Sequence, residues 1–580
     1  MSNSLTMTPV LPALSVRSAT VEVGRRVLLE QVSFDLPEGR LLAVVGPSGA
    51  GKTTLLRALS GRLKPSAGTV TVGGRPAAEL RDTVGMVPQD DILHRQLTVG
   101  RALDYAARLR LPAGVDRASR ISGALDQLGL APVAGQRVST LSGGQRKRVN
   151  VALELLTDPA VLFLDEPTSG LDPALDRDVM VHLRELTSTG RTVVVTTHNV
   201  LHLDVADYVL ALAPGGRLAY FGPPDGLLDA FAATTYAQVF DRLGWWDITH
   251  TPTSGENVSG GTERRSREAP MTELFGELAT GGPADGSASG ASVAGVSGRP
   301  TPSGPAVVGG RPGWLRQVGV LAARAVRVVA ADPALAAFLA ALPVALALLA
   351  KAVPGADGLA APTGTPTQEA QQLLVILIVG ACFMGTASAV RELVGERRIY
   401  LREAHAGLRP SAYLASKLLV LAPITAAQSA AVVVLTLAGR QAPDKALLLG
   451  NGTLELAAVV FAVAYASACL GLLISALVST EAQAMPVLVV AVMTQLVLCG
   501  GMFALTGRAG YEEAALLSPS RWAYAAAAGS VDLRSFMALP LDEPLWEHSR
   551  AAFVTAMAAL AGAAAWLSGA AYLALARRAR

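Results

Sequence analysis

The sequence predicts two folds in one chain, an α/β domain followed by an all-α domain of six transmembrane helices. Short apolar β-rich runs alternate with helical patterns over residues 19–221, and long apolar stretches follow beyond about Arg327, where charged residues become sparse. Hydrophobic residues make up 51% of the 580 residues and charged residues 16%. An average soluble protein has about 25% charged residues. The first half is therefore predicted to be soluble and the second to face lipid.

Charge and cysteine content exclude several classes of function. The 49 basic and 46 acidic residues are balanced, and no concentrated basic stripe indicates a nucleic-acid partner. The three cysteines lie in apolar runs without metal-ligand spacing, which argues against a disulfide framework and against a zinc site. Residues 1–21 lack the pattern of a signal peptide, so the first domain is expected in the cytoplasm.

The soluble half is predicted to contain one α/β domain over residues 19–247, after a tail of residues 1–18. The runs 41–45 and 161–164 are almost continuously apolar, which is typical of a parallel sheet covered by helices on both faces. Residues 248–312 are rich in Gly, Ser, Thr and Pro and predict a flexible linker.

The domain over residues 313–580 is predicted to lie in the membrane. Arginines interleave with apolar residues over 314–331, which favours an amphipathic connecting helix at the membrane surface. The segments that would then face the cytoplasm hold roughly twice as many Lys and Arg as the outer segments, which agrees with a cytoplasmic first domain. Six apolar stretches approach the ~20 residues needed to cross a bilayer: 333–350, 372–390, 418–438, 454–478, 484–505 and 551–574.

The most specific motif fits the pattern G-x-x-x-x-G-K-[ST], follows a predicted strand and opens a predicted helix. Backbone N–H groups of such a loop converge on phosphates, Lys52 can reach the β- and γ-phosphates, and the Thr53 hydroxyl can bind Mg²⁺. An ordinary glycine-rich turn is the alternative, and the order of strand, loop and helix argues against it. The motif predicts a P-loop nucleotide site formed by Gly46, Pro47, Ser48, Gly49, Ala50, Gly51, Lys52, Thr53 and Thr54.

Two carboxylates follow the apolar strand 161–164. Ligands of such sheets bind at the carboxyl ends of the strands, where these side chains would meet the phosphates. Asp165 is predicted to hold Mg²⁺ directly or through water, and Glu166 to polarise the water that attacks the γ-phosphate. A solvated strand end is the alternative.

At this point the domain resembles the nucleotide-binding domain of an ABC transporter. The family's signature loop is matched by Leu141, Ser142, Gly143, Gly144 and Gln145. The resemblance implies that this loop, at a helix N-terminus, completes the ATP site of a partner domain in a head-to-tail dimer. Gln89 looks like the Q-loop glutamine, which senses Mg²⁺, Asp172 looks like the D-loop aspartate, and His198 looks like the switch histidine that hydrogen-bonds the γ-phosphate.

One departure from the family pattern concerns the adenine ring. Family members usually place an aromatic residue upstream of the phosphate loop, whereas no Phe, Tyr or Trp precedes Phe34 here. Val21 or Val23 is expected in that place, so that adenine is held by apolar contacts alone.

An ATPase domain followed by six spans resembles the white/ABCG half-transporters, whose membrane domain is of the ABC-2 type. Local resemblances include residues 89–93, 396–403 and 517–522. Leu141 and Gln145 resemble bacterial members, notably actinobacterial proteins that carry a forkhead-associated domain in front, for which about twenty preceding residues leave no room.

The resemblance implies an ATP- and Mg²⁺-dependent half-transporter of the cell membrane that exports its substrate. The partner would be a second half-transporter chain, most simply in a homodimer. Few ionisable residues lie in the predicted spans, which favours ATP over ion coupling as the energy source and a lipid-like or hydrophobic cargo. The alternative is an ATP-driven mechanical or regulatory membrane protein that translocates nothing through its spans. A soluble ABC ATPase acting on nucleic acid is contradicted by the six spans.

Overall fold

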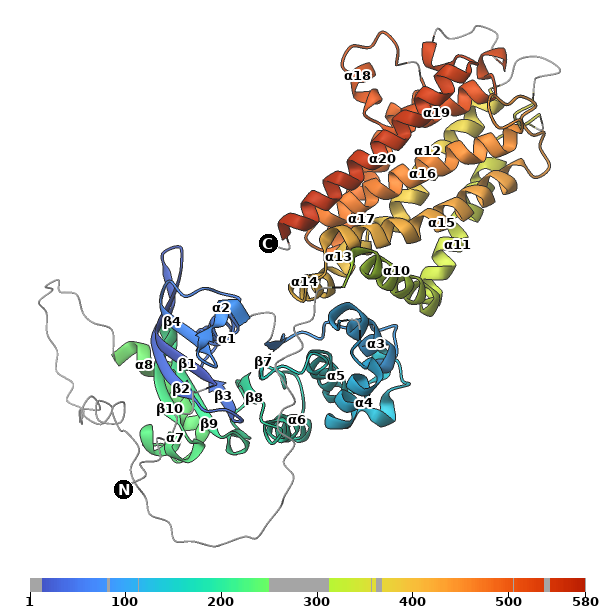
Figure 1. Ribbon diagram of the computed structural model, residues 1–580. Helices are drawn as coiled ribbons and strands as arrows, with labels where there is room; N and C mark the ends of the chain where they lie inside the picture. The colour runs from blue at the N-terminus through green and yellow to red at the C-terminus, as the bar shows by residue number, and fades with distance from the viewer. Residues whose placement is uncertain are drawn as a thin grey trace, which may run out of the picture. The chain divides into compact units, whose positions relative to one another are not determined.

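The computed structural model describes residues 13–80, 84–112, 114–249, 312–355, 357–360, 368–503, 505–536 and 543–578. Most of the predicted tail and nearly all of the predicted linker lie outside these residues. The chain divides into two compact units, an α/β unit before Gly310 and a helical unit formed mainly by the residues from Arg311 onward. Figure 1 shows the strands gathered in the first unit and the long helices in the second.

The first unit contains one ten-stranded sheet with the order β5-β4-β1-β2-β10-β9-β3-β8-β7-β6. The predicted parallel sheet is confirmed for the five strands at one end of this order, β9-β3-β8-β7-β6. The strands span Leu14–Val23 (β1), Arg26–Leu36 (β2), Leu41–Val45 (β3), Ala67–Val72 (β4), Arg75–Pro76 (β5), Gly85–Val87 (β6), Val161–Asp165 (β7), Thr192–Thr196 (β8), Tyr208–Ala213 (β9) and Arg217–Gly222 (β10).

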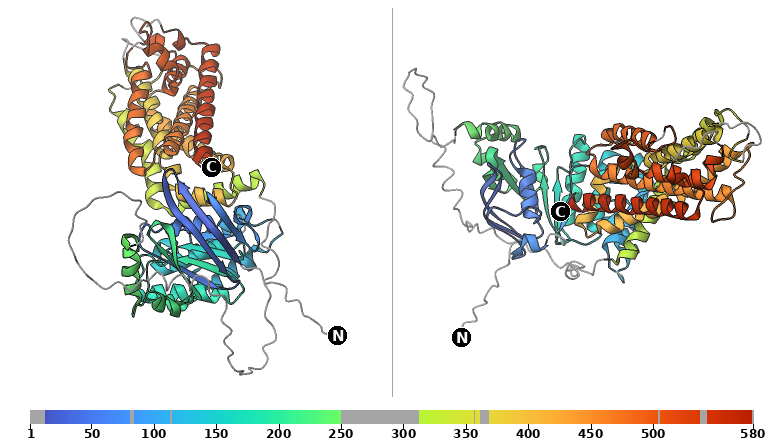
Figure 2. Two further views of the ribbon diagram at one scale, coloured as in Figure 1. Left: turned by 90° about the vertical axis from the view of Figure 1, so that its left-hand side faces the viewer. Right: turned by 90° about the horizontal axis from the view of Figure 1, so that it is seen from above.

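The other part of the sheet is mainly antiparallel, and the parallel sheet predicted from the apolar runs 41–45 and 161–164 does not extend into it. Strands β1 and β2 run side by side as a long hairpin (Figure 2), and β4 pairs antiparallel with β1. Buried and exposed residues mix along β1, as Val16 and Arg17 illustrate. An antiparallel sheet can leave one face in water, and such a strand does not need the continuous apolar run of a parallel strand.

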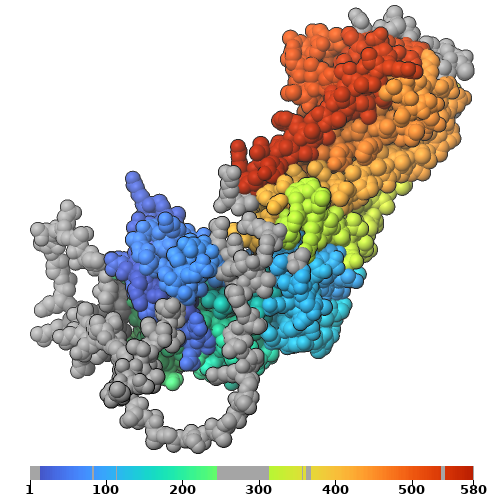
Figure 3. Space-filling model, viewed as in Figure 1, coloured from blue at the N-terminus to red at the C-terminus, as the bar shows by residue number. Residues whose placement is uncertain are grey.

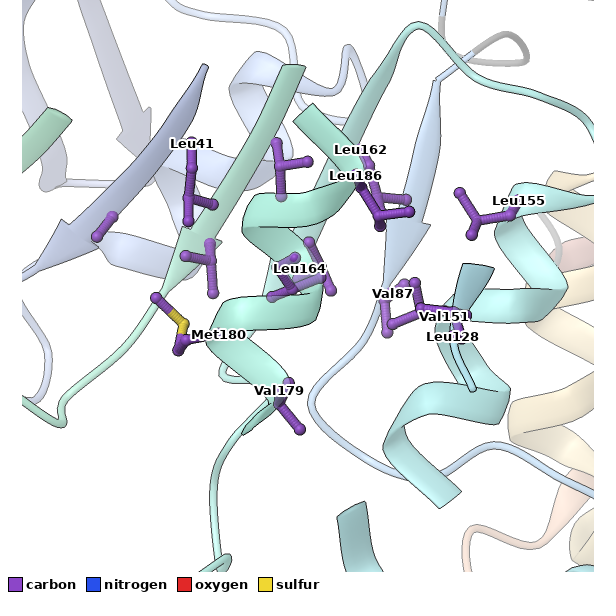
Figure 4. Close-up of a cluster of buried hydrophobic side chains, with 14 of the residues drawn as sticks. Leu41, Val87, Leu128, Val151, Leu155, Leu162, Leu164, Val179, Met180 and Leu186 are labelled. Atoms are coloured by element: carbon purple, nitrogen blue, oxygen red, sulfur yellow. The ribbon is translucent and has the colours of Figure 1, made fainter. Parts of the chain in front are cut away.

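Alternate residues of β3 enter two different cores. Leu41, Ala43 and Val45 join a cluster with the helices α3 to α6, whereas Leu42 and Val44 pack with α1 and the antiparallel strands. Helices therefore cover one face as predicted, and α1 shares the other face with strands. Figure 4 shows part of the first cluster, with Leu162 and Leu164 of β7 beside α6. The helices of this unit are α1 (Lys52–Leu59), α2 (Ala77–Leu80), α3 (Val99–Arg110), α4 (Arg117–Gln127), α5 (Gly143–Leu155), α6 (Pro173–Thr187), α7 (Pro224–Ala230) and α8 (Tyr236–Thr249).

The second unit contains six helices, within the described residues, that are long and apolar enough to cross a membrane. Helices α12 and α16 form its centre, and α11, α17 and α20 expose most of their apolar surface. Figure 3 shows α15 and α20 within one continuous packed surface. The helices are α10 (Trp314–Ala331), α11 (Pro333–Lys351), α12 (Glu369–Ala389), α13 (Glu392–Gly395), α14 (Arg397–His405), α15 (Pro410–Leu437), α16 (Gly452–Leu477), α17 (Glu481–Leu498), α18 (Tyr511–Leu516), α19 (Pro519–Ser530) and α20 (Arg550–Arg578).

Local features explain where two of these helices differ from the predicted stretches. Helix α15 begins eight residues before the predicted start at 418, with Pro410 in its first turn, where the missing N–H of proline is tolerated. Helix α17 ends at Leu498 instead of 505. The cause is Gly500, whose φ of 81° is a left-handed conformation that ends a helix.

A buried ion pair joins the connecting helix α10 to α14. Arg324 Nη2 lies 3.0 Å from Glu403 Oε2, and both side chains are less than one tenth exposed. Burial raises the pKa of the Glu403 carboxyl, but the charge and hydrogen bonds of Arg324 outweigh it and hold the pKa below its ordinary value.

We expect Arg324→Met to lower the free energy of unfolding by roughly 3 kcal/mol, because it leaves a buried carboxylate without its partner. Denaturant unfolding of the full chain in detergent measures this loss. Lys445→Met is the control, since the exposed Lys445 pairs with Asp532 at 2.6 Å, and exposed pairs contribute at most about 1 kcal/mol. Equal losses in the two variants would contradict the expectation.

Candidate functional site

The predicted phosphate loop connects β3 to α1 and depends on its glycines. Gly46 and Gly51 have φ values of 152° and 96°. A Cβ atom at Gly46 would lie 2.4 Å from the Leu212 carbonyl oxygen, and one at Gly51 would lie 2.6 Å from that of Leu28. Only glycine fits at either position. The loop leads into the N-terminus of α1, where unpaired N–H groups and the helix dipole favour an anion.

The ammonium group of Lys52 crosses this loop. Its Nζ donates to the carbonyl oxygens of Gly46 at 2.8 Å and Pro47 at 3.1 Å. Burial lowers the pKa of Lys52, while the charges of Glu166 and Asp165 act in the opposite direction. The cation and the two carboxylates therefore share one electrostatic environment, as the motifs predicted.

Asp165 ends β7 beside the start of α1. The Thr53 hydroxyl donates to Asp165 Oδ1 at 3.2 Å, so two of the predicted magnesium ligands lie together. The Thr196 hydroxyl donates to the same oxygen at 2.8 Å. Sequence reasoning missed Thr196, although a polar residue that closes an apolar strand next to β7 was a usable signal.

Glu166 is the point where three segments meet. Gln89 Nε2 donates to Glu166 Oε2 at 2.9 Å, and His198 Nδ1 lies 3.4 Å from the same oxygen. The backbone of Glu166 has a φ of 45°, which is unusual for a residue other than glycine. The structure therefore brings together the three residues that were predicted as catalytic.

The signature loop lies at a different helix. Ser142 caps α5: its Oγ accepts from the Gln145 N–H at 3.2 Å, and Gln145 Oε1 accepts from the Ser142 N–H at 3.0 Å. Asp172 caps α6 in a similar way, accepting from the Leu175 N–H. A Cβ atom at Gly143 would lie 2.9 Å from Leu171, so the signature and D-loop segments pack closely. No hydrogen bond or ion pair among the described residues joins the signature loop to Lys52, Asp165 or Glu166.

Asp91 links the Gln89 segment to the signature helix, and sequence reasoning gave it no role. Its carboxylate lies 3.3 Å from Arg146 Nε and 3.5 Å from Lys147 Nζ, and it accepts from Asn150 Nδ2 at 3.1 Å. Lys147 also donates to the backbone carbonyl of Gln89. The usable signal was the acidic pair after Gln89 together with the basic run after the signature.

The two valines that were expected to contact adenine differ in their exposure. Val21 is buried in the core between the sheet and α1, so it is not available to a ligand and that alternative was wrong. Val23 is 57% exposed at the end of β1, and the exposed Val27 lies near it on β2. Of the two valines, only Val23 is therefore exposed to a ligand.

Comparison with known families matches both units. The model of the ABC transporter family matches residues 29–169, and that of the ABC-2 type transporter family matches residues 316–531. The matches follow the order in which the α/β unit and the helical unit occur in the chain.

Individual relatives agree with these matches. The ABC transporter ATP-binding/permease protein Rv1747 of Mycobacterium tuberculosis is 41% identical over 560 residues, which cover 94% of this chain and 61% of that protein. ABC transporter G family member 22 of Arabidopsis thaliana is 38% identical over 38% of this chain and 30% of its own length. The broad substrate specificity transporter ABCG2 of Rattus norvegicus is 35% identical over 37% of this chain and 34% of its own length.

The chain thus spans less than two thirds of each of these relatives, and the match to Rv1747, over 94% of this chain, extends through both units. The phosphate loop, the converging Gln89, Glu166 and His198, and the six apolar helices agree with both family matches. The chain therefore carries an ABC transporter domain over residues 29–169 followed by an ABC-2 type transporter domain over residues 316–531, and it has G-family ABC transporters among its relatives.

Proposed function

We propose that this protein is a half-transporter that binds and hydrolyses ATP, dimerises and exports a lipid-like or hydrophobic substrate across the cell membrane. One observation carries the proposal: Glu166, oriented by Gln89 and His198, lies beside a phosphate loop in a chain whose described residues include six apolar helices long enough to cross a membrane. The ATPase domain would lie in the cytoplasm.

The residues at the end of β7 fit a Mg²⁺ ion that accompanies ATP. The hydroxyl of Thr53 and the carboxylate of Asp165 are within 3.2 Å of each other, and Mg²⁺ prefers such oxygen ligands. Gln89 adds a side-chain carbonyl next to Glu166. When bound, the ion would neutralise part of the phosphate charge.

Each remaining residue has a role that follows from its position. Lys52 and the N–H groups of the loop 46–54 would hold the phosphates. Glu166 would accept a hydrogen bond from the attacking water and polarise it, while Gln89 and His198 fix the direction of its carboxylate. Because hydrolysis needs the reacting groups aligned, this preorganisation lowers the barrier.

The signature loop is separate from the phosphate loop of its own chain, and this separation supports a dimer. Ser142 lies at the N-terminus of α5, where the helix dipole favours a γ-phosphate. It forms no described bond to the phosphate loop of its own chain. We propose that it completes the ATP site of a second copy of this chain, since one sequence supplies both halves of two equivalent sites.

The membrane unit supports an apolar cargo. Among the described residues of the six apolar helices, ionisable side chains lie near the helix ends. The buried polar groups Thr386, Ser467 and Gln495 are neutral, whereas the buried charged residues Glu369, Lys417 and Glu455 lie within eight residues of the start of their helices. A charged or sugar-phosphate cargo would need compensating charges along its path.

The test is ATP-dependent accumulation of a panel of lipids and hydrophobic compounds in inside-out vesicles. We expect accumulation with the wild-type protein and none with Glu166→Gln. Accumulation that is equal in both proteins would contradict ATP-driven transport. ATP hydrolysis without accumulation of any compound would favour the mechanical or regulatory alternative.

A further inference from the structure

Thr196 lies between the Asp165 carboxylate and the backbone of Glu166. It is the last residue of β8 and pairs with Asp165 in the parallel register of β7 and β8. Its side chain is fully buried. Since the carboxyl ends of parallel strands meet at one edge of the sheet, this register brings its hydroxyl to the start of the Glu166 turn.

The Thr196 hydroxyl makes two hydrogen bonds with opposite roles. It donates to Asp165 Oδ1 at 2.8 Å and accepts from the Glu166 backbone N–H at 2.9 Å. A hydroxyl has one donor and two acceptor positions, so a single group can serve both partners at once. The orientation of the Asp165 carboxylate and the position of the Glu166 backbone therefore depend on the same atom.

The second bond acts on a strained residue. With a φ of 45°, Glu166 adopts a left-handed conformation that is strained for a residue with a Cβ atom. Such a conformation persists only where the surroundings hold it in place. The direction in which the Glu166 side chain leaves this turn decides whether it reaches Gln89 and His198.

We propose that Thr196 is a positioning residue for ATP hydrolysis. Its hydroxyl sets the Asp165 carboxylate for Mg²⁺ and the Glu166 turn for the attacking water. This inference rests on the proposed ATPase function, and it adds a residue to which neither the motifs nor the relatives assign a role.

The same strand provides a matched control. Thr192, the first residue of β8, is also buried, and its hydroxyl accepts from the Gly39 N–H at 3.1 Å. Thr192 therefore has the same residue type, burial and strand as Thr196 but no bond to Asp165 or Glu166. A purely structural role for buried threonines of β8 predicts equal effects at both positions.

The experiment compares Thr196→Val, Thr196→Ser and Thr192→Val in the full-length protein. Steady-state hydrolysis gives kcat and KM for ATP, and a fluorescent ATP analogue gives the Mg²⁺ concentration for half-maximal binding. We expect Thr196→Val to lower kcat by about 10- to 100-fold with KM within about threefold, since a misplaced catalytic group reduces rate more than binding. It should also raise the Mg²⁺ requirement severalfold.

Thr196→Ser keeps the hydroxyl and should restore kcat to within about threefold of the wild type, because both hydrogen bonds remain available. Thr192→Val should leave kcat and the Mg²⁺ requirement unchanged. Thr196→Ala tests the same loss of the hydroxyl without a second methyl group, should the valine variant not fold. Thermal unfolding establishes that the compared variants are folded.

The proposal is overturned if loss of the Thr196 hydroxyl leaves both kcat and the Mg²⁺ requirement at wild-type values, or if Thr192→Val lowers kcat equally. The binding measurement separates this failure from failure of the proposed function. A wild-type protein without hydrolysis would contradict the proposed ATPase, whereas the Mg²⁺ requirement would still distinguish Thr196→Val from Thr192→Val.

Discussion

Glu166→Gln is expected to abolish ATP turnover while the chain continues to bind ATP. The amide has nearly the shape of the carboxylate but no negative charge with which to polarise water, and loss of a general base typically lowers the rate by about 10²- to 10⁴-fold. Lys52 and the phosphate loop are unchanged, so the affinity for ATP should stay within about threefold. Phosphate release and equilibrium binding of an ATP analogue measure the two quantities.

Glu185→Gln is the matched control for this change. Glu185 also contacts a histidine, since its Oε2 lies 3.1 Å from His182 Nδ1. Unlike Glu166, Glu185 lies on the exposed side of α6. The Glu185→Gln variant should hydrolyse ATP at the wild-type rate. Unchanged hydrolysis in Glu166→Gln would remove Glu166 from its proposed role.

Ser142→Arg is expected to abolish hydrolysis with ATP binding preserved. The new side chain places bulk and positive charge where the signature loop would receive the γ-phosphate of the partner, and it removes the Ser142 cap of α5. Loss of a cap alone costs about 1 kcal/mol. Asp116→Arg controls for that cost, because Asp116 caps α4 through the N–H groups of Ala118 and Ser119.

Mixed dimers distinguish a signature loop that acts on the partner from one that acts on its own chain. A dimer of one Ser142→Arg chain and one Glu166→Gln chain has one intact site if the loop acts across the dimer, and none if it acts within the chain. A dimer of the double variant with the wild-type chain has the opposite outcome. We expect hydrolysis in the first dimer and none in the second, measured on dimers purified through two different tags. The reverse result would contradict the proposed composite site.

Local sequence determined much of the site and of the fold class. The loop from Gly46 to Thr53 depends on glycines and on the strand and helix beside it, so its geometry follows from neighbouring residues. The six apolar helices are equally local, because each must satisfy its own backbone hydrogen bonds within the membrane. Glu166 was predictable from its place at the end of an apolar strand, whereas His198 was identified through the resemblance to the ABC transporter family.

Tertiary structure alone decided the contacts between distant segments. The hydrogen bonds of Thr196 with Asp165 and Glu166 join residues about thirty positions apart in sequence, and Asp91 meets Asn150 across 59 positions. The antiparallel edge of the sheet and the burial of Val21 likewise depend on which strands pair. The type of a residue does not show which group its side chain will contact, because a hydroxyl or carboxylate is the same chemical group in solvent as in a buried network. The role of the side chain is set only when strand register and helix packing bring the second group within hydrogen-bond distance.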